Sequence, residues 1–113
     1  MLTYALIIFA IAAVGGLVLA ASVLRGKLAP WALSIVHALL GATGLVLLVI
    51  AILQGAASSR ASAALALLVV AALGGFYLVS FHVRKQIAPK AAVVIHAGVA
   101  VTGFLTLLSI VLF

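Results

Sequence analysis

The sequence predicts an all-α integral membrane protein, an up-down-up-down four-helix bundle built from two tandem, parallel repeats of one helical hairpin. Of its 113 residues, 70% are hydrophobic and 5% are charged, whereas soluble domains are about 45–50% apolar and about 25% charged. Four apolar segments are long enough to cross a bilayer, which takes roughly 20 residues of helix. The second half of the chain also repeats the pattern of the first.

The four predicted transmembrane helices cover residues 2–24, 30–53, 61–83 and 89–113, all within one membrane domain. Arg25-Gly26-Lys27 ends the first helix and Arg84-Lys85-Gln86 ends the third, while residues 54–60 form a loop between the hairpins. Pro30 and Pro89 stand in the first turn of a helix, where proline is tolerated. The first segment lacks a basic leading region and recurs as the third, so we interpret it as structural rather than as a signal peptide.

An offset of 59 residues superimposes residues 1–54 on residues 60–113. The polar and conformationally special residues match best in this alignment. The matched sets are Gly15-Gly16 with Gly74-Gly75, Arg25 with Arg84, Ala29-Pro30 with Ala88-Pro89, His37 with His96, and Thr43-Gly44 with Thr102-Gly103. Because a hairpin enters and leaves the membrane on one side, both copies have the same orientation, related by an axis along the membrane normal.

Charge indicates the topology. The chain has six basic residues and no acidic ones. Five of the cations lie at the two hairpin turns and only Arg60 lies in the middle loop. The positive-inside rule therefore places the turns in the cytoplasm and both termini outside, as expected in a bacterial inner membrane. These cations favour anionic lipid headgroups as partners, not nucleic acid. Cysteine is absent, which excludes disulfides and covalently attached haem.

Two histidines are the candidate metal ligands. His37 and His96 each lie seven residues after a proline, roughly 10 Å below the basic turns. Their helices, the second and fourth, should lie on a diagonal of the bundle, with axes roughly 11–14 Å apart. Two imidazoles that point inward could then meet one atom between them. A haem iron with two axial histidines requires this arrangement.

Residues around the histidines would make room for the ring. The positions below His37 and His96 on the same helix faces are small, and the glycine pairs of the first and third helices lie roughly 15 Å from the basic turns, near the expected ring edge. Arg25 and Arg84 could bind propionates, and Tyr77 lies at about the histidine depth. The cofactor-binding candidates, besides the two histidines, are Gly41, Gly44, Ala100, Gly103, Gly15, Gly16, Gly74, Gly75, Arg25, Arg84 and Tyr77.

Through His37, His96 and the small residues beneath them, the chain resembles the four-helix core of membrane b-type cytochromes. The resemblance implies one non-covalent haem b held by both histidines and a role in electron transfer, with a quinone or a redox partner subunit. It is also compatible with a homo-oligomer. Better-known members stack two haems with a second histidine further along each helix. Here Ile50-Ala51 and Ser109-Ile110 occupy those regions, so one haem at most is expected.

Structural interpretations stay open beside the functional ones. A neutral histidine in a membrane helix can bond a backbone carbonyl, and small residues let membrane helices pack closely. Arg25 and Arg84 also serve as topology signals. His82 has Val23 as its counterpart in the first repeat, and we expect it to reach the headgroup region from its place near the interface.

Other function classes are also open. Small multidrug exporters share this size but depend on a membrane glutamate, and fluoride channels depend on asparagine; both residues are absent. Zinc or copper would need three or four ligands. A single histidine could ligate a chlorophyll. A cofactor-free scaffold subunit or a small transporter of another kind remains the alternative. No nucleophile, acid–base pair or phosphate loop is evident, which favours an electron carrier over a bond-making enzyme.

Overall fold

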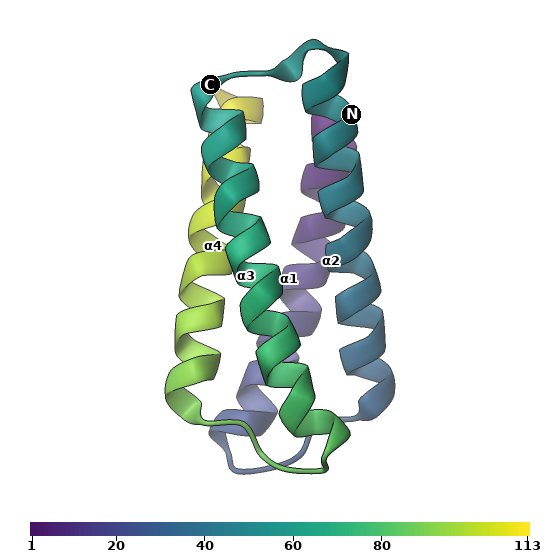
Figure 1. The fold of residues 1–113 in the computed structure, drawn as a ribbon, viewed down its shortest axis with the longest axis vertical. Coiled ribbons are helices and arrows are strands. Elements are labelled where there is room, and N and C mark those ends of the chain that lie inside the picture. Colours follow the sequence, from purple (N-terminus) through teal and green to yellow (C-terminus); the bar gives the residue numbers. More distant parts are fainter.

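The chain folds into four antiparallel helices, described for all residues 1–113 by a computed structural model. They are α1 (Leu2–Leu24), α2 (Trp31–Ala51), α3 (Ser59–Val83) and α4 (Lys90–Leu112), and a short π-helical segment, η1 (Ile52–Ala56), extends α2. Both termini lie at one end of the bundle and the α1–α2 and α3–α4 turns lie at the other (Figure 1). The predicted all-helical chain with four long apolar helices is confirmed.

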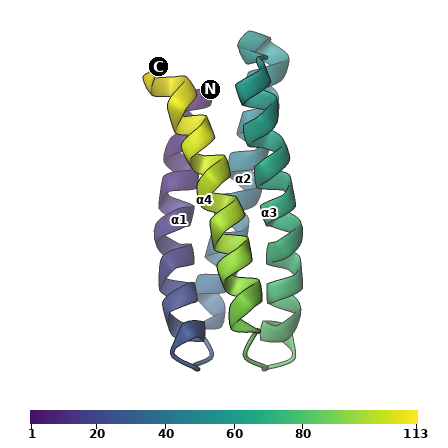
Figure 2. The same ribbon diagram turned by 90° about the vertical axis from the view of Figure 1, so that its left-hand side faces the viewer.

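Helix packing follows the order of the chain. The closest neighbours are α1 with α2 and α3 with α4, the two hairpins. The two hairpins contact each other through α1 and α4 and, less extensively, through α2 and α3. The α2–α3 contact is the smallest between neighbouring helices of the bundle. Figures 1 and 2 show the same order from two sides. As a result, α2 and α4 lie on one diagonal and α1 and α3 lie on the other.

The two hairpin turns share one backbone conformation. After α1, Gly26 has φ 74°, and after α3 the residue 59 positions later, Lys85, has φ 55°. In both turns the next amide donates back to the carbonyl five residues earlier, from Lys27 to Ser22 and from Gln86 to Phe81. This left-handed ending satisfies the last carbonyls of each helix. The prolines precede α2 and α4 as N-caps, so these helices begin one residue later than the sequence predicted.

The connection between the hairpins is shorter than the predicted loop over residues 54–60. Helix α2 continues through η1 to Ala56, where Gly55 takes φ 112° and turns the chain. The Ser58 hydroxyl then accepts a hydrogen bond from the Ala61 amide at 3.0 Å and caps the start of α3. The difference arises from this local capping, which satisfies an otherwise free helix amide and starts α3 two residues early.

The tightest packing lies in the half of the bundle near the termini. Its core consists of Ala5, Phe9, Leu48, Ala64, Leu68 and Leu107. Only 15 residues are buried, and none of them is polar or charged. The outer surface is apolar instead, with side chains such as Leu17, Leu39 and Leu73 more than 60% exposed. All four helices are long and apolar enough to cross a membrane.

Candidate functional site

His37 on α2 and His96 on α4 face each other across the bundle. Their ring centroids are 6.4 Å apart and the ring planes are at 81° to each other. Both side chains are half-buried. The α2–α4 diagonal and the equal distance of each histidine from its helix start bring the rings together. The pair lies in the half of the bundle nearer the hairpin turns, away from the apolar core.

The ring nitrogens of this pair are only partly satisfied. His37 donates from Nδ1 to the Ala12 carbonyl at 2.8 Å, which leaves Nε2 unprotonated in the neutral ring, with its lone pair free. His96 Nδ1 is buried without a hydrogen-bond partner. The backbone of Ala71, 59 positions after Ala12, lies beside it, but outside hydrogen-bond geometry. This nitrogen faces α3, since a Cβ at Gly74 would lie 3.4 Å from it.

Glycines on the first helix of each hairpin make room for the imidazoles. A Cβ at Gly16 would lie 2.8 Å from His37 Cε1, which is closer than atoms approach. On α3, Cβ atoms at Gly74 and Gly75 would lie 3.4 Å from the His96 ring. These pairs were expected at a cofactor edge, and Gly16, Gly74 and Gly75 lie against the histidines instead. Gly15 instead faces Leu33.

Two of the small positions below the histidines are covered by side chains. A Cβ at Gly44 would lie 2.7 Å from Phe9, and one at Gly103 would lie 2.9 Å from Leu68. Phe9 and Leu68 are 59 positions apart and belong to the apolar core. They therefore form a floor beneath the histidine pair. Gly41, which lies nearer the basic turns than Gly44, has open space around it. Ala100 is half-buried.

The remaining predicted residues point away from the pair. Arg25 Nε donates to the Ala21 carbonyl and Arg84 Nε donates to the Ser80 carbonyl, so each guanidinium folds back on the end of its own helix. The Arg84 guanidinium also lies 4.8 Å from the centroid of the Phe81 ring. Tyr77 is 54% exposed and contacts Phe81 edge to face. These three residues do not line the histidine site.

His82 was expected to reach toward headgroups, and the structure corrects this. Its Nδ1 lies 2.6 Å from the Ser34 hydroxyl and its Nε2 donates to the Ala29 carbonyl at 2.9 Å. The ring also packs edge to face against Trp31 at 4.8 Å. His82 thus joins the end of α3 to the start of α2. We name His82, Ser34, Ala29 and Trp31 the interhairpin cluster.

Sequence reasoning missed the interhairpin cluster, although a signal existed. At two matched positions, one hairpin has a polar residue and the other has valine. These positions pair His82 with Val23 and Ser34 with Val93. A polar residue in one hairpin with an apolar counterpart in the other can mark a contact that only one hairpin makes. Two such differences at similar depth could have indicated that the side chains meet.

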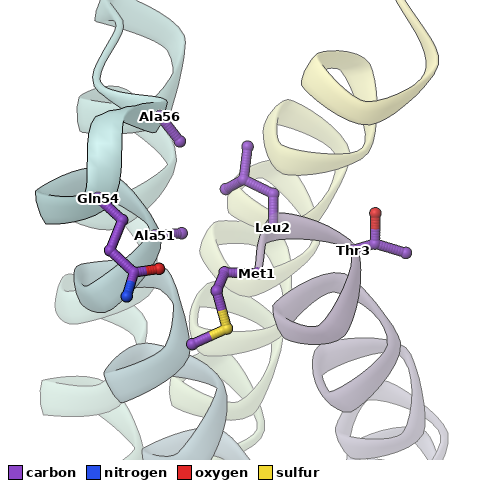
Figure 3. A pocket seen from close by; sticks show the side chains of 6 residues that line it. All are labelled: Met1, Leu2, Thr3, Ala51, Gln54 and Ala56. Carbon is purple, nitrogen blue, oxygen red and sulfur yellow. The ribbon is translucent and has the colours of Figure 1, made fainter.

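Two cavities lie away from the histidine pair. One of about 330 Å³ opens at the terminal end, lined by Met1, Leu2, Thr3, Ala51, Gln54 and Ala56. Figure 3 shows Ala51 and Ala56 pointing from α2 and η1 toward the first residues of α1. A second cavity, of about 260 Å³, lies between α2 and α3 and is lined only by apolar side chains. No histidine lines either cavity.

The donor set around the pair consists of two imidazoles. No group of three or more histidine, cysteine or acidic side chains comes together anywhere in the chain. Structural zinc usually takes four protein ligands and catalytic zinc three, so the pair fits an axial role on a metal already held by a macrocycle better than a bare zinc ion. None of the comparisons with protein-family models, curated proteins and solved structures finds a match to this chain.

Proposed function

We propose that this protein is a membrane electron carrier that binds one haem b between His37 and His96. The observation that carries the proposal is the 6.4 Å separation of the two ring centroids. An imidazole nitrogen binds a metal at about 2 Å and lies roughly 1 Å from its ring centroid, so two imidazoles on opposite sides of one metal have centroids roughly 6 Å apart. The pair therefore already has the spacing of two axial ligands.

A direct aromatic contact between the histidines is the competing interpretation, because edge-to-face rings also lie 4.5–7 Å apart. The hydrogen bonds favour ligation over this contact. The only hydrogen bond of either ring joins His37 Nδ1 to Ala12, and His96 Nδ1 is buried and unpaired. An aromatic contact leaves Nε2 of His37 and Nε2 of His96 without a hydrogen-bond partner. Coordination to iron would satisfy one nitrogen of each ring.

The chain's own residues account for most of what such a site needs. The Ala12 carbonyl fixes the tautomer and orientation of His37, as outer-shell partners of metal ligands do. Gly16 lets the His37 ring lie against α1, and Gly74 and Gly75 contact the His96 ring on α3 at the edge of ordinary van der Waals distance. When bound, haem b supplies one-electron redox chemistry tuned by its axial ligands and by burial.

The shape of the bundle also supports the proposal. A flat ring perpendicular to the His37–His96 line would run along the bundle axis and extend toward α1 and α3. At that level Gly16 on α1 and Gly74 and Gly75 on α3 already lie against the His37 and His96 rings. Phe9 and Leu68 on Gly44 and Gly103 would limit it from below. Because the α2–α3 contact is the smallest in the bundle, α2 and α3 could move apart by the small amount that the ring requires.

The outer surface supports placement in a membrane. Its exposed apolar side chains surround the whole bundle, far more than a soluble monomer exposes. The longest dimension, 42 Å, matches the about 40–45 Å of a bilayer with its headgroups. The basic turns would lie in the cytoplasm of a bacterium among anionic lipids. Since one haem near that side cannot carry electrons across alone, a quinone or a redox partner subunit would exchange them.

Absorption spectroscopy tests the proposal. Protein expressed with ample haem and purified in detergent should be red, with a Soret band that shifts on reduction by dithionite. His37→Ala and His96→Ala should each remove the six-coordinate spectrum, whereas Tyr77→Phe, a change at an outward-facing ring, should leave it intact. Colourless wild-type protein would refute haem binding. Unchanged spectra in both alanine variants would refute the assigned ligands.

A further inference from the structure

We propose that Ser34 and His82 bind one propionate carboxylate of the haem, a role the sequence analysis gave to Arg25 and Arg84. This inference rests on the proposed function. Ser34 lies three residues before His37 on the same face of α2, roughly 4.5 Å closer to the basic turns. His82 lies seven residues after Gly75 on the same face of α3, roughly 10 Å closer to them. Their 2.6 Å contact therefore covers the histidine pair on the side of the basic turns.

The two arginines are poor candidates for the same role. Each donates from Nε to a carbonyl of its own helix end, and each is exposed. Ser22 and Ser80 also bond carbonyls of their own helices, Val18 and Tyr77. Ser34 and His82 are thus a hydroxyl and an imidazole at this end of the bundle that bond each other between two helices.

The hydrogen-bond inventory of the interhairpin cluster fits a carboxylate. His82 Nε2 donates to the Ala29 carbonyl. With a neutral ring, the Ser34 hydroxyl donates its proton to Nδ1. With an imidazolium, Nδ1 donates to Ser34 instead, and the hydroxyl proton becomes free to bond a carboxylate. In that form the cluster offers a positive charge and a free donor, which is the complement of a propionate. The other charged groups at this end are Arg25, Lys27, Arg84, Lys85 and Lys90, all cationic.

The cluster exists on one side of the bundle only. The counterparts of His82 and Ser34, Val23 and Val93, lie 59 positions earlier and later, and Val93 is buried. A ring that extends toward both α1 and α3 would therefore find a polar partner for one propionate, on the α3 side, and apolar side chains on the α1 side. The difference would fix the ring in one orientation within an otherwise nearly symmetric bundle.

Haem dissociation into an excess of a haem-scavenging protein tests this inference. His82→Val and Ser34→Val each copy the residue of the other repeat, so the fold has a precedent for both. Each should release haem about tenfold faster than wild type, because Ser34→Val removes the donor to the carboxylate and His82→Val removes the charge that frees that donor. Ser80→Ala, which removes a neighbouring hydroxyl bonded to its own helix, should release haem at the wild-type rate.

Haem dimethyl ester, which has no free carboxylate, separates propionate binding from helix packing. Wild type, His82→Val and Ser34→Val should all release the ester at one rate. Wild-type release rates for native haem in both variants would overturn the inference and leave the proposed function standing. Equal acceleration with native haem and with the ester would overturn it too, because the cluster would then act only as a contact between hairpins. A wild-type protein without a Soret band would refute the proposed function itself.

Discussion

The absence of a side chain at Gly16 lets the His37 ring lie close to α1. Any side chain at this position would meet the imidazole, since a Cβ would lie 2.8 Å from Cε1. The hydrogen bond from Nδ1 to the Ala12 carbonyl holds the ring in that place. Gly15, the adjacent residue, has only Leu33 at an ordinary contact distance of 3.8 Å. The two neighbouring glycines therefore have different importance for the site.

Gly16→Ala should lower haem affinity at least tenfold, because the methyl group displaces His37 from its axial position. Gly15→Ala is the matched control and should keep wild-type affinity. Haem titration of the two purified apoproteins, followed at the Soret band, measures the difference. Equal affinities in the two variants would mean that His37 is not held against α1 as described.

Gly44 has a different role, because it receives the Phe9 ring. Gly44→Ala should destabilise the protein by about 1–3 kcal/mol, the usual cost of overpacking a well-packed contact. Gly41→Ala should cause no loss and a small gain, since the space around Gly41 is open and alanine favours helix. Thermal unfolding in detergent compares the two variants. A Gly44→Ala protein as stable as Gly41→Ala would contradict the packed floor.

At the scale of the elements, the two hairpin turns have equal geometry but unequal residues. Gly26 adopts φ 74° at no steric cost, whereas Lys85 adopts φ 55° with a side chain. A left-handed conformation costs a residue with a Cβ about 1–2 kcal/mol. The α3–α4 turn therefore stores strain that the α1–α2 turn avoids.

Lys85→Gly should stabilise the protein by about 1 kcal/mol, since it removes this strain. Gly26→Ala, which introduces the strain into the other turn, should destabilise it by a similar amount. Both variants can be compared with wild type by unfolding in detergent at high salt, which screens the effect of the lost charge. The account of the turns fails if Lys85→Gly is less stable than wild type.

The sequence was sufficient to predict four long apolar helices, because long apolar runs determine them. It could not predict contacts that depend on helix rotation. The filling of Gly44 by Phe9 and the outward direction of Tyr77 are set by packing between helices. The π-helical end of α2 and the Ser58 cap depend on local hydrogen bonding, which apolar composition does not reveal. His82 joins Ser34 across 48 residues, a distance beyond any local pattern.

At the scale of the whole molecule, the bundle has two different halves. The half near the termini holds the packed apolar core, which supports the fold. The half near the basic turns holds the histidine pair and the interhairpin cluster. The proposed orientation places this second half toward the cytoplasm, where a soluble or membrane partner could approach the cofactor edge.

Single cysteines test this orientation directly, because the native chain has none. A cysteine at Lys27 should react with a membrane-impermeant maleimide only in inverted vesicles. A cysteine at Ala57, between the hairpins, should react only in intact spheroplasts. The reverse labelling pattern would invert the proposed topology, and labelling of both sites in the same preparation would argue against transmembrane insertion.

The central claim is that two histidines of one chain hold one haem b. Its most direct test is an optical titration of the purified apoprotein with haem, with wild type compared with the His37→Ala/His96→Ala double variant. We expect saturation at one haem per chain with a low-spin, six-coordinate spectrum in the wild type and no such species in the double variant. A six-coordinate spectrum in the double variant, or no saturable binding in the wild type, would contradict the account.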